Sequence, residues 1–218
     1  MVEVEVKYAA GDFAAVAARL AALGATEGDP RDDADEYFNA PDRDFARTDE
    51  ALRIRRINAD NRVTYKGPRR DAHTKTRTEI EVPLAPGDAA AADFARLLTS
   101  LGYRPVAVVR KHRRTFHLER EGFAAEATLD DVEGVGRYVE LEIVVPEDRL
   151  PAARDAVLRL ADELGLTAAE RRSYLELLLR KKEGQEGKKP EGQEARRPKS
   201  QKAKKPEGRE AKKSESKQ

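Results

Sequence analysis

Acidic and apolar residues alternate at three places along the chain, at residues 3–6, 79–82 and 140–143. Each run is followed by apolar side chains at helical spacing and then by a glycine. The pattern predicts three units of a strand and a helix. Asp12 and Asp88 occupy the N-cap positions expected for the first two helices, the third carries Leu150, and the helices are expected to end at Gly24, Gly102 and Gly165.

Further runs are typical of strands, at residues 52–57, 62–66, 106–116 and 123–129. Turn-forming segments at 58–61 and 119–122 separate them in pairs, which predicts antiparallel hairpins. A hairpin is also expected around Gly134 and Gly136, and a last helix over residues 168–181. About eight strands with three or four helices predict an α+β domain.

The charged residues of these strands fall on one face. Because successive side chains of a strand point to opposite faces, Glu3, Glu5 and Lys7 share one face. The same rule groups Arg53 with Arg55, Arg62 with Lys66, Arg77 with Glu79 and Glu81, Lys111 with Arg113, and Glu140 with Glu142. For any one such strand, the simplest interpretation is a half-buried sheet whose charged face meets water.

The signs of these charges favour a different arrangement for the whole set. Some strands carry mostly carboxylates and others only basic residues, whereas a solvated face usually mixes both signs. The helices also need the apolar strand faces to pack on, which points the charged faces at each other. We therefore expect a closed sheet that forms a polar-lined tunnel with acidic and basic sectors.

A charged interior of this kind implies a ligand, because buried charges must be paired or must bind ions. Carboxylates two residues apart suit hard divalent cations such as Mg²⁺ or Mn²⁺, and Arg and Lys side chains suit phosphate oxygens. The pattern therefore predicts a metal-bound polyphosphate as the ligand.

Several segments resemble the CYTH superfamily, which groups class IV adenylate cyclases with thiamine-triphosphatases and inorganic triphosphatases. The family's N-terminal Glu-x-Glu-x-Lys signature is present as Glu3, Glu5 and Lys7, and further matches follow in order at residues 35–38, 51–55, 64–68, 77–81, 111–114, 129–136 and 173–178. The resemblance runs from residue 1 to about residue 181. It implies an α+β fold: an eight-stranded antiparallel closed β-barrel, the triphosphate tunnel, with a polar, charged interior and helices packed outside.

The resemblance also implies roles for individual residues. Lys7 is expected to contact phosphate or the reacting centre. The metal ligands, for Mg²⁺ or Mn²⁺, are expected to be Glu3, Glu5, Asp130, Glu140 and Glu142. The residues expected to bind the triphosphate are Arg53, Arg55, Lys66, Arg77, Lys111 and Arg113. Glu79 and Glu81 are expected to orient the basic residues.

Residues 75–79, 129–140 and 173–178 look most like the class IV cyclase branch. The reaction implied is the conversion of ATP to 3′,5′-cyclic AMP and pyrophosphate. A triphosphatase acting on inorganic triphosphate, thiamine triphosphate or a nucleoside triphosphate would use the same tunnel, and the sequence leaves both reactions open. A non-catalytic polyphosphate or nucleotide sensor is disfavoured by the intact metal-ligand positions.

The last 36 residues contain no Val, Ile, Leu, Phe, Tyr or Met and cannot form a core. They hold two copies of a repeat rich in Lys, Glu, Gly and Pro, at 188–195 and 204–211, which predicts disorder. We expect a CYTH triphosphate-tunnel domain over residues 1–182 and a disordered tail over 183–218. The tail carries 12 basic and 7 acidic residues, against 30 and 34 in the preceding part. A solvated spacer is favoured over a contact with nucleic acid, an acidic protein or a membrane surface.

The chain has no cysteine, which excludes disulfides and thiolate metal sites. Its first residues lack the basic and apolar segments of a signal peptide, and no long apolar run occurs, so we expect a cytoplasmic protein that does not enter membranes. The resemblance is compatible with a homodimer. Residues 67–73 predict a loop, either a lid over substrate or an idle surface segment, and His73, His112 and His117 are not spaced as ligands.

Overall fold

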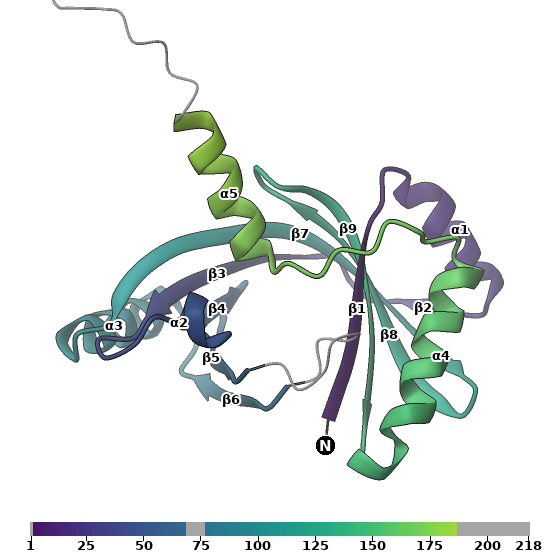
Figure 1. Cartoon of the computed structure of the whole chain (residues 1–218), viewed down its shortest axis with the longest axis horizontal. Coiled ribbons are helices and arrows are strands. Elements are labelled where there is room, and N and C mark those ends of the chain that lie inside the picture. The colour runs from purple at the N-terminus through teal and green to yellow at the C-terminus, as the bar shows by residue number, and fades with distance from the viewer. Residues whose placement is uncertain (1, 69–76, 187–218) are drawn as a thin grey trace, which may run out of the picture. The chain divides into compact units, whose positions relative to one another are not determined.

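The fold is built on one antiparallel sheet (Figure 1). The computed structural model describes residues 2–68 and 77–186 of the chain. Within them the strands are β1 (Val2–Ala9), β2 (Thr26–Glu27), β3 (Arg31–Asn39), β4 (Ala51–Ile57), β5 (Asp60–Lys66), β6 (Glu79–Leu84), β7 (Arg104–Arg120), β8 (Phe123–Val132) and β9 (Gly136–Val145). The helices are α1 (Phe13–Ala22), α2 (Phe45–Thr48), α3 (Asp88–Ser100), α4 (Leu150–Glu163) and α5 (Tyr174–Glu186), with a 3₁₀ turn at Glu147–Arg149.

The strands follow one another in the sheet in the order β1-β9-β8-β7-β3-β4-β5-β6, and β2 pairs with β7. The predicted hairpins β4–β5, β7–β8 and β8–β9 are confirmed. Within the described residues no backbone pairing joins β1 to β6, so the sheet is a curled half-barrel with an open seam. The α+β prediction is confirmed, but the prediction of a closed barrel is wrong for this part of the chain. Alternation identifies the faces of strands, whereas closure depends on their tilt and stagger.

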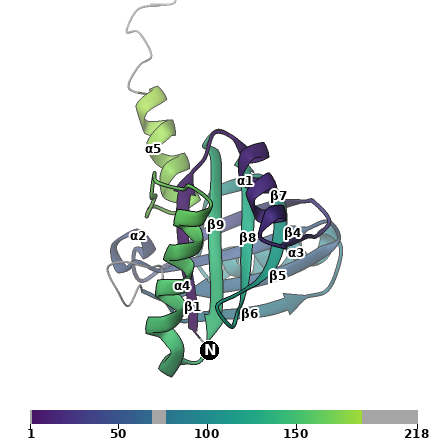
Figure 2. The ribbon, with the colours of Figure 1, turned by 90° about the vertical axis from the view of Figure 1, so that its right-hand side faces the viewer.

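Helices α1 and α4 cover the outer face of β1, β9 and β8 (Figure 2). Strand residues such as Val4 and Leu141 pack there against helix residues such as Leu160, all at most 1% exposed. Helix α3 forms a second core with β4, through contacts that include Ile54 and Leu98. The three predicted units of a strand and a helix are therefore confirmed as elements of the fold. Each helix packs apolar side chains on the strand faces, but Leu97 and Leu101, in and just after α3, are 50% and 62% exposed.

The ends of these helices match the predicted caps in part. The side chain of Asp12 caps α1 by accepting a hydrogen bond from the Ala15 backbone nitrogen at 3.0 Å. Gly24, Gly102 and Gly165 follow the ends of α1, α3 and α4 with φ values of 81°, 89° and 68°, a conformation that favours glycine. The prediction for Asp88 is wrong, because Gly87 is the N-cap and Asp88 is the first residue of α3.

The last helix departs from the prediction in its start and in its place. α5 begins at Tyr174, not at residue 168, because Ser173 and Glu176 form a reciprocal cap. The Glu176 backbone nitrogen donates to Ser173 Oγ at 3.1 Å, and the Ser173 backbone nitrogen donates to Glu176 Oε2 at 2.6 Å. α5 also packs against Val109 and Tyr138, which lie on the concave face, whereas all helices were expected outside.

Parts of the chain named in the predictions lie outside the described residues. These are residues 69–76, which hold most of the predicted loop and His73, and residues 187–218, which hold most of the predicted tail. α5 runs through the expected boundary at residue 182 and ends at Glu186, so the boundary and the tail stay predictions. His112 and His117 are exposed strand residues. Among the residues that the structure describes, no helix is long and apolar enough to cross a membrane.

Candidate active site

A cavity of about 700 Å³ opens on the concave face of the sheet. The charged strand faces line it, as the alternation predicts. Of the predicted site residues, those that line the cavity are Glu3, Glu5, Lys7, Arg53, Arg55, Lys66, Arg77, Glu79, Glu81, Lys111, Arg113, Glu140 and Glu142. Asp130 lies beneath its wall. The fold thus gathers residues from strands far apart in the sequence, and their roles stay predictions.

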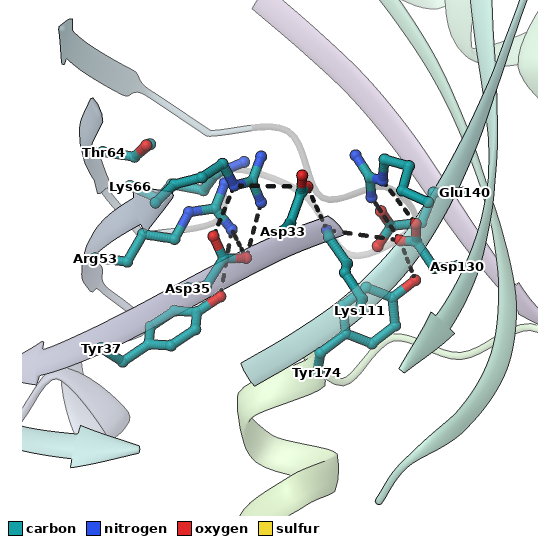
Figure 3. A network of polar contacts seen from close by, with 12 residues as sticks. Asp33, Asp35, Tyr37, Arg53, Thr64, Lys66, Lys111, Asp130, Glu140 and Tyr174 are labelled. Carbon is teal, nitrogen blue, oxygen red and sulfur yellow. Dashed lines mark hydrogen bonds and ion pairs between the residues drawn. The ribbon is translucent and has the colours of Figure 1, made fainter. Parts of the chain in front are cut away.

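On β3, Asp35 holds the two arginines of β4 in place (Figure 3). Arg55 donates from Nε to Asp35 Oδ1 at 2.6 Å and from Nη2 to Asp35 Oδ2 at 2.9 Å. Arg53 Nη1 lies 3.4 Å from Asp35 Oδ2 and 3.3 Å from the Tyr37 hydroxyl oxygen. Burial alone would raise the pKa of the Asp35 carboxyl, but Arg53 and Arg55 hold that pKa below its usual value. Asp35 is therefore a fixed anion beneath two cations that face the cavity.

On β8, Asp130 plays the same part for Arg113. Arg113 donates from Nε to Asp130 Oδ1 at 2.6 Å and from Nη2 to Asp130 Oδ2 at 2.5 Å, and Nη2 also reaches Glu140 Oε2 at 2.8 Å. Asp130 is fully buried, and both of its carboxylate oxygens accept hydrogen bonds. The observed contacts of Asp130 orient Arg113, and its expected role as a metal ligand stays a prediction.

Lys111 lies between the two parts of the network (Figure 3). Its Nζ is 3.6 Å from Asp130 Oδ2 and 3.8 Å from Asp33 Oδ2. Burial, and then the charge of Arg113, lower the pKa of the Lys111 ammonium to about 8. An anion in the cavity would favour the charged form of this lysine, because it would offset the neighbouring positive charges.

Carboxylates gather on the other side of the cavity, on β1, β9 and β8. Glu5 pairs with Glu142 between β1 and β9, and Glu142 pairs with Glu126 between β9 and β8. Burial, and then the charges of Glu5 and Glu126, raise the pKa of Glu142 to about 7. Burial also raises the pKa of Glu3 to about 9, with Glu142 and Glu5 adding to the shift and Lys66 opposing it. The raised pKa values mean that Glu3 and Glu142 bind protons more tightly than free carboxyl groups do. A bound metal cation would stabilise the same negative charges in place of the protons.

The chemistry of this donor set fits a hard divalent cation. Carboxylate oxygens are the ligands that Mg²⁺ prefers and that suit Mn²⁺, and a double positive charge would relieve the mutual repulsion that raises the pKa of Glu142. Over residues 2–68 and 77–186, no three Asp, Glu or His side chains already form a metal site. The expected Mg²⁺ or Mn²⁺ therefore stays a prediction.

Side chains from both edges of the sheet meet across the open seam. Lys66 Nζ lies 2.8 Å from Glu79 Oε2 and 3.7 Å from Glu3 Oε1. Because Glu3 is on β1 and Lys66 on β5, this contact joins the acidic and basic sides of the cavity. Glu79 lies beside a predicted phosphate-binding lysine, and Glu81 accepts a hydrogen bond from Arg62 Nη1 at 2.8 Å. Both positions agree with an orienting role.

Lys7 lies where β1 passes the start of α5. Its Nζ donates to the backbone carbonyl of Arg172 at 2.5 Å and lies 4.0 Å from the centre of the Tyr174 ring. Its strand partner is Glu140 on β9, so it borders the carboxylates. Lys7 is only 2% exposed, so the surrounding side chains restrict where its ammonium group can lie.

One end of the cavity, called here the apolar end, carries apolar side chains beside the polar residues Asp44, Glu50 and Glu176. Toward this end the concave face changes from charged residues to Tyr37 on β3, Ala51 on β4 and Ala107 on β7. Larger apolar side chains that line the cavity include Phe45 from α2 and Leu175 and Leu179 from α5. Leu175 packs against the cluster that holds Tyr37, which also contacts Arg53. The apolar end is therefore continuous with the basic side.

The sequence predictions do not include several residues of the cavity and its network among the site residues: Asp33, Asp35, Tyr37, Glu126 and Tyr174. Alternation along β8 places Glu126 on the same face as Asp130, so the pattern could have identified it. Asp35 and Tyr37 lie in a segment that carries the resemblance, and their spacing puts them on one face. Tyr174 also lies in a segment that carries the resemblance, at residues 173–178, but it belongs to a helix, so strand alternation could not assign it to the concave face.

The half-barrel and its charged concave cavity define an α+β protein built on one curled antiparallel sheet. The model of the CYTH domain matches residues 1–174. The chain therefore belongs to the CYTH family, and the predicted resemblance is confirmed.

Relatives with names and a solved structure agree with this assignment. "Putative adenylate cyclase MJ0240" of Methanocaldococcus jannaschii is 37% identical over 180 residues, covering 81% of the chain and 98% of that protein. "Adenylate cyclase CyaB" of Aeromonas hydrophila is 33% identical over 181 residues, covering 80% of the chain and 87% of that protein. The structure of the PH1819 protein from Pyrococcus horikoshii has a TM-score of 0.72 and 40% identity, covering 82% of the chain and 99% of its own.

Proposed function

We propose that the chain is an adenylate cyclase that converts ATP to 3′,5′-cyclic AMP and pyrophosphate with Mg²⁺ or Mn²⁺. Family membership and the adenylate cyclase names of two relatives support this reaction class. The observation that carries the choice of substrate is the continuity between the basic side of the cavity and its apolar end.

The apolar end favours a nucleoside triphosphate over inorganic triphosphate. Inorganic triphosphate presents only charged oxygens, which gain nothing beside Phe45, Leu175 or Leu179. With the phosphates of a nucleotide on Arg53 and Lys111, its base and ribose extend toward that end. A cavity of about 700 Å³ lies within the range of about 300–1,000 Å³ for small-molecule sites.

The basic residues supply preorganised charge for the reaction. The ribose 3′-hydroxyl gives up its proton to water as its oxygen forms a bond to the α-phosphorus, and the bond from that phosphorus to the bridging oxygen of the leaving pyrophosphate breaks. Arg55 and Arg113 would hold the leaving oxygens, because Asp35 and Asp130 already fix their guanidinium groups. Donors fixed before the reaction need little reorganisation when charge develops.

The carboxylates complete the site. Glu3, Glu5, Glu140 and Glu142 are the residues that would hold the divalent metal. When bound, such a metal neutralises phosphate charge and lowers the pKa of the attacking hydroxyl. Lys7 lies next to Glu140 in the strand register and would contact the phosphate or the reacting centre.

A product assay tests the proposal. Purified chain is incubated with ATP and Mg²⁺ or Mn²⁺, and the products are identified by mass spectrometry. Cyclic AMP and pyrophosphate in equal amounts are expected. Orthophosphate without cyclic AMP would contradict the cyclase and identify a triphosphatase, and binding without turnover would identify a sensor.

Two matched substitutions control this assay. Glu142→Gln removes one carboxylate charge from the cavity at nearly constant volume, and we expect it to abolish metal-dependent turnover. Glu163→Gln makes the same chemical change on α4, where Glu163 pairs with Arg120, and should leave turnover unchanged. Full activity of Glu142→Gln would contradict the proposed role of the carboxylates.

A further inference from the structure

Tyr174, the first residue of α5, contacts groups from three strands of the site. Figure 3 shows it beside Lys111 and Asp130. It is 6% exposed, and its hydroxyl donates to Asp130 Oδ2 at 2.9 Å. The centre of its ring lies 4.0 Å from Lys7 Nζ and 5.4 Å from Lys111 Nζ. One side chain therefore links β1, β7 and β8.

On the basis of the adenylate cyclase function proposed above, we propose that Tyr174 is a positioning residue that sets Lys7, Lys111 and Arg113 for the triphosphate. It acts through its ring on the two lysines and through its hydroxyl on Asp130, which holds Arg113.

The ring offers a fixed surface to two ammonium groups that the sheet itself does not bring together. β1 and β7 are separated by β9 and β8, so Lys7 and Lys111 do not meet through strand pairing. The face of an aromatic ring attracts cations within about 6 Å of its centre. Because the ring carries no net charge, it does not itself neutralise either lysine.

The hydroxyl acts on Arg113 through a shared acceptor. Asp130 Oδ2 accepts from both the Tyr174 hydroxyl and Arg113 Nη2. Burial, and then the charges of Glu140 and Asp130, raise the pKa of Tyr174 well above its usual value, so the hydroxyl remains a donor. Without this bond, Asp130 would lose one of the contacts that fix its carboxylate plane, and with it the direction of Arg113.

The chain next to Tyr174 is itself tied to β1. The Arg172 backbone carbonyl accepts from Lys7 Nζ at 2.5 Å, and the Glu170 backbone nitrogen donates to the Lys7 carbonyl at 2.7 Å. The reciprocal cap between Ser173 and Glu176 then sets the direction in which α5 leaves. The ring is therefore placed by backbone contacts on both sides.

Two substitutions separate the parts of this residue. Tyr174→Phe keeps the ring and removes the hydroxyl, and we expect kcat/KM for cyclic AMP formation to fall about tenfold. Tyr174→Leu removes both, and a fall of about 100-fold is expected. The affinity for inorganic tripolyphosphate with Mg²⁺, measured by calorimetry, should fall by about tenfold in Tyr174→Leu and less in Tyr174→Phe.

Leu178→Ala serves as the control for a purely structural effect. Leu178 is a buried residue of the same helix that does not line the cavity. This variant should melt at a lower temperature but keep kcat/KM and tripolyphosphate affinity when measured well below its melting point. If Tyr174→Leu shows the same result, Tyr174 only supports the fold, and the positioning role is overturned.

The binding measurement separates this inference from the proposed reaction. If the unaltered chain makes no cyclic AMP but Tyr174→Leu weakens tripolyphosphate binding, the cyclase is wrong and the positioning role stands. Equal tripolyphosphate affinity and equal kcat/KM in the unaltered chain and Tyr174→Leu would overturn the positioning role. Absence of tripolyphosphate binding by the unaltered chain would overturn the positioning role, whereas the cyclase is decided by the cyclic AMP assay.

Discussion

Individual buried carboxylates compensate the positive charges of the basic residues on the concave face. Asp35, which is 1% exposed, receives three hydrogen bonds from Arg53 and Arg55. Removing one partner of such a buried group is far more costly than removing an exposed pair, because the remaining charges have neither partner nor water. The buried anions therefore permit a dense cluster of cations in the absence of substrate.

We expect Asp35→Ala to lower the free energy of unfolding by about 3–5 kcal/mol, since Arg53 and Arg55 would be left facing each other. Urea unfolding at neutral pH measures this change. Asp93→Ala is the control, because Asp93 pairs with Arg96 in an exposed contact on α3 and its removal should alter stability by less than about 0.5 kcal/mol. Equal losses in the two variants would show that Asp35 does not compensate buried charge.

The acidic residues give stability a particular dependence on pH in the absence of metal. The pKa of Glu3 is raised to about 9 from its usual value of 4.5. Between these values the folded chain keeps a proton that the unfolded chain has lost, so stability should fall as the pH rises. Glu3→Gln cannot lose a proton and should show a shallower fall.

Thermal unfolding in the presence of a chelator, between pH 5 and about 8, compares these slopes. Glu163→Gln is the control, because it changes an exposed carboxylate of α4 and should keep the slope of the unaltered chain. A slope in Glu3→Gln as steep as that of the unaltered chain would contradict the assignment of the proton to Glu3.

Individual elements differ in how well their sequence reveals them. β1, β6 and β9 follow from alternation, because period two is a local property of an extended chain. β3 is not predicted from the sequence, because residues 31–36 carry charges on both faces of the strand and show no alternation of apolar and polar residues. The start of α5 is missed for another reason. Residues 168–172 are good helix formers, but backbone bonds between Ala9 and Ala168 and between Lys7 and Glu170 hold them beside β1.

The cap of α5 is the element on which the position of Tyr174 depends. Ser173→Ala should lower the free energy of unfolding by about 0.5–2 kcal/mol, because the Glu176 backbone nitrogen loses its acceptor. Ser100→Ala is the matched control, since Ser100 is the last residue of α3 and has no capping role. Urea unfolding of the two variants gives the difference, and a loss at Ser100 as large as that at Ser173 would contradict the importance of the cap.

At the scale of the whole molecule, the sequence predicts the charged faces but not how the two edge strands of the sheet meet. The residues of the cavity could be sorted because each strand shows its own alternation. The open seam could not be predicted, since it depends on the cumulative twist of eight strands. The position of α5 on the concave face could not be predicted either, because its apolar residues are compatible with either face of the sheet.

The open seam predicts how the molecule should respond to its substrate. The acidic residues lie on β1 and β9 and the basic ones on β4, β5 and β7, so a metal-bound triphosphate would contact both sides of the seam. In the described part of the chain, the ion pair of Lys66 and Glu3 already bridges it at 3.7 Å. A ligand held from both sides should therefore reduce local opening of the two edge strands.

We expect amide hydrogen exchange in β1 and β6 to slow when a non-hydrolysable ATP analogue and Mg²⁺ are added. Exchange in α4 should slow only by the amount that the gain in global stability accounts for. At a ligand concentration of 100 times Kd, global stability should rise by about 2.7 kcal/mol. Lys66→Met removes the bridging cation and should reduce the protection of β6 more than that of β9. Protection confined to β1 and β9 would show that the ligand binds the acidic side alone, and that the seam plays no part in binding.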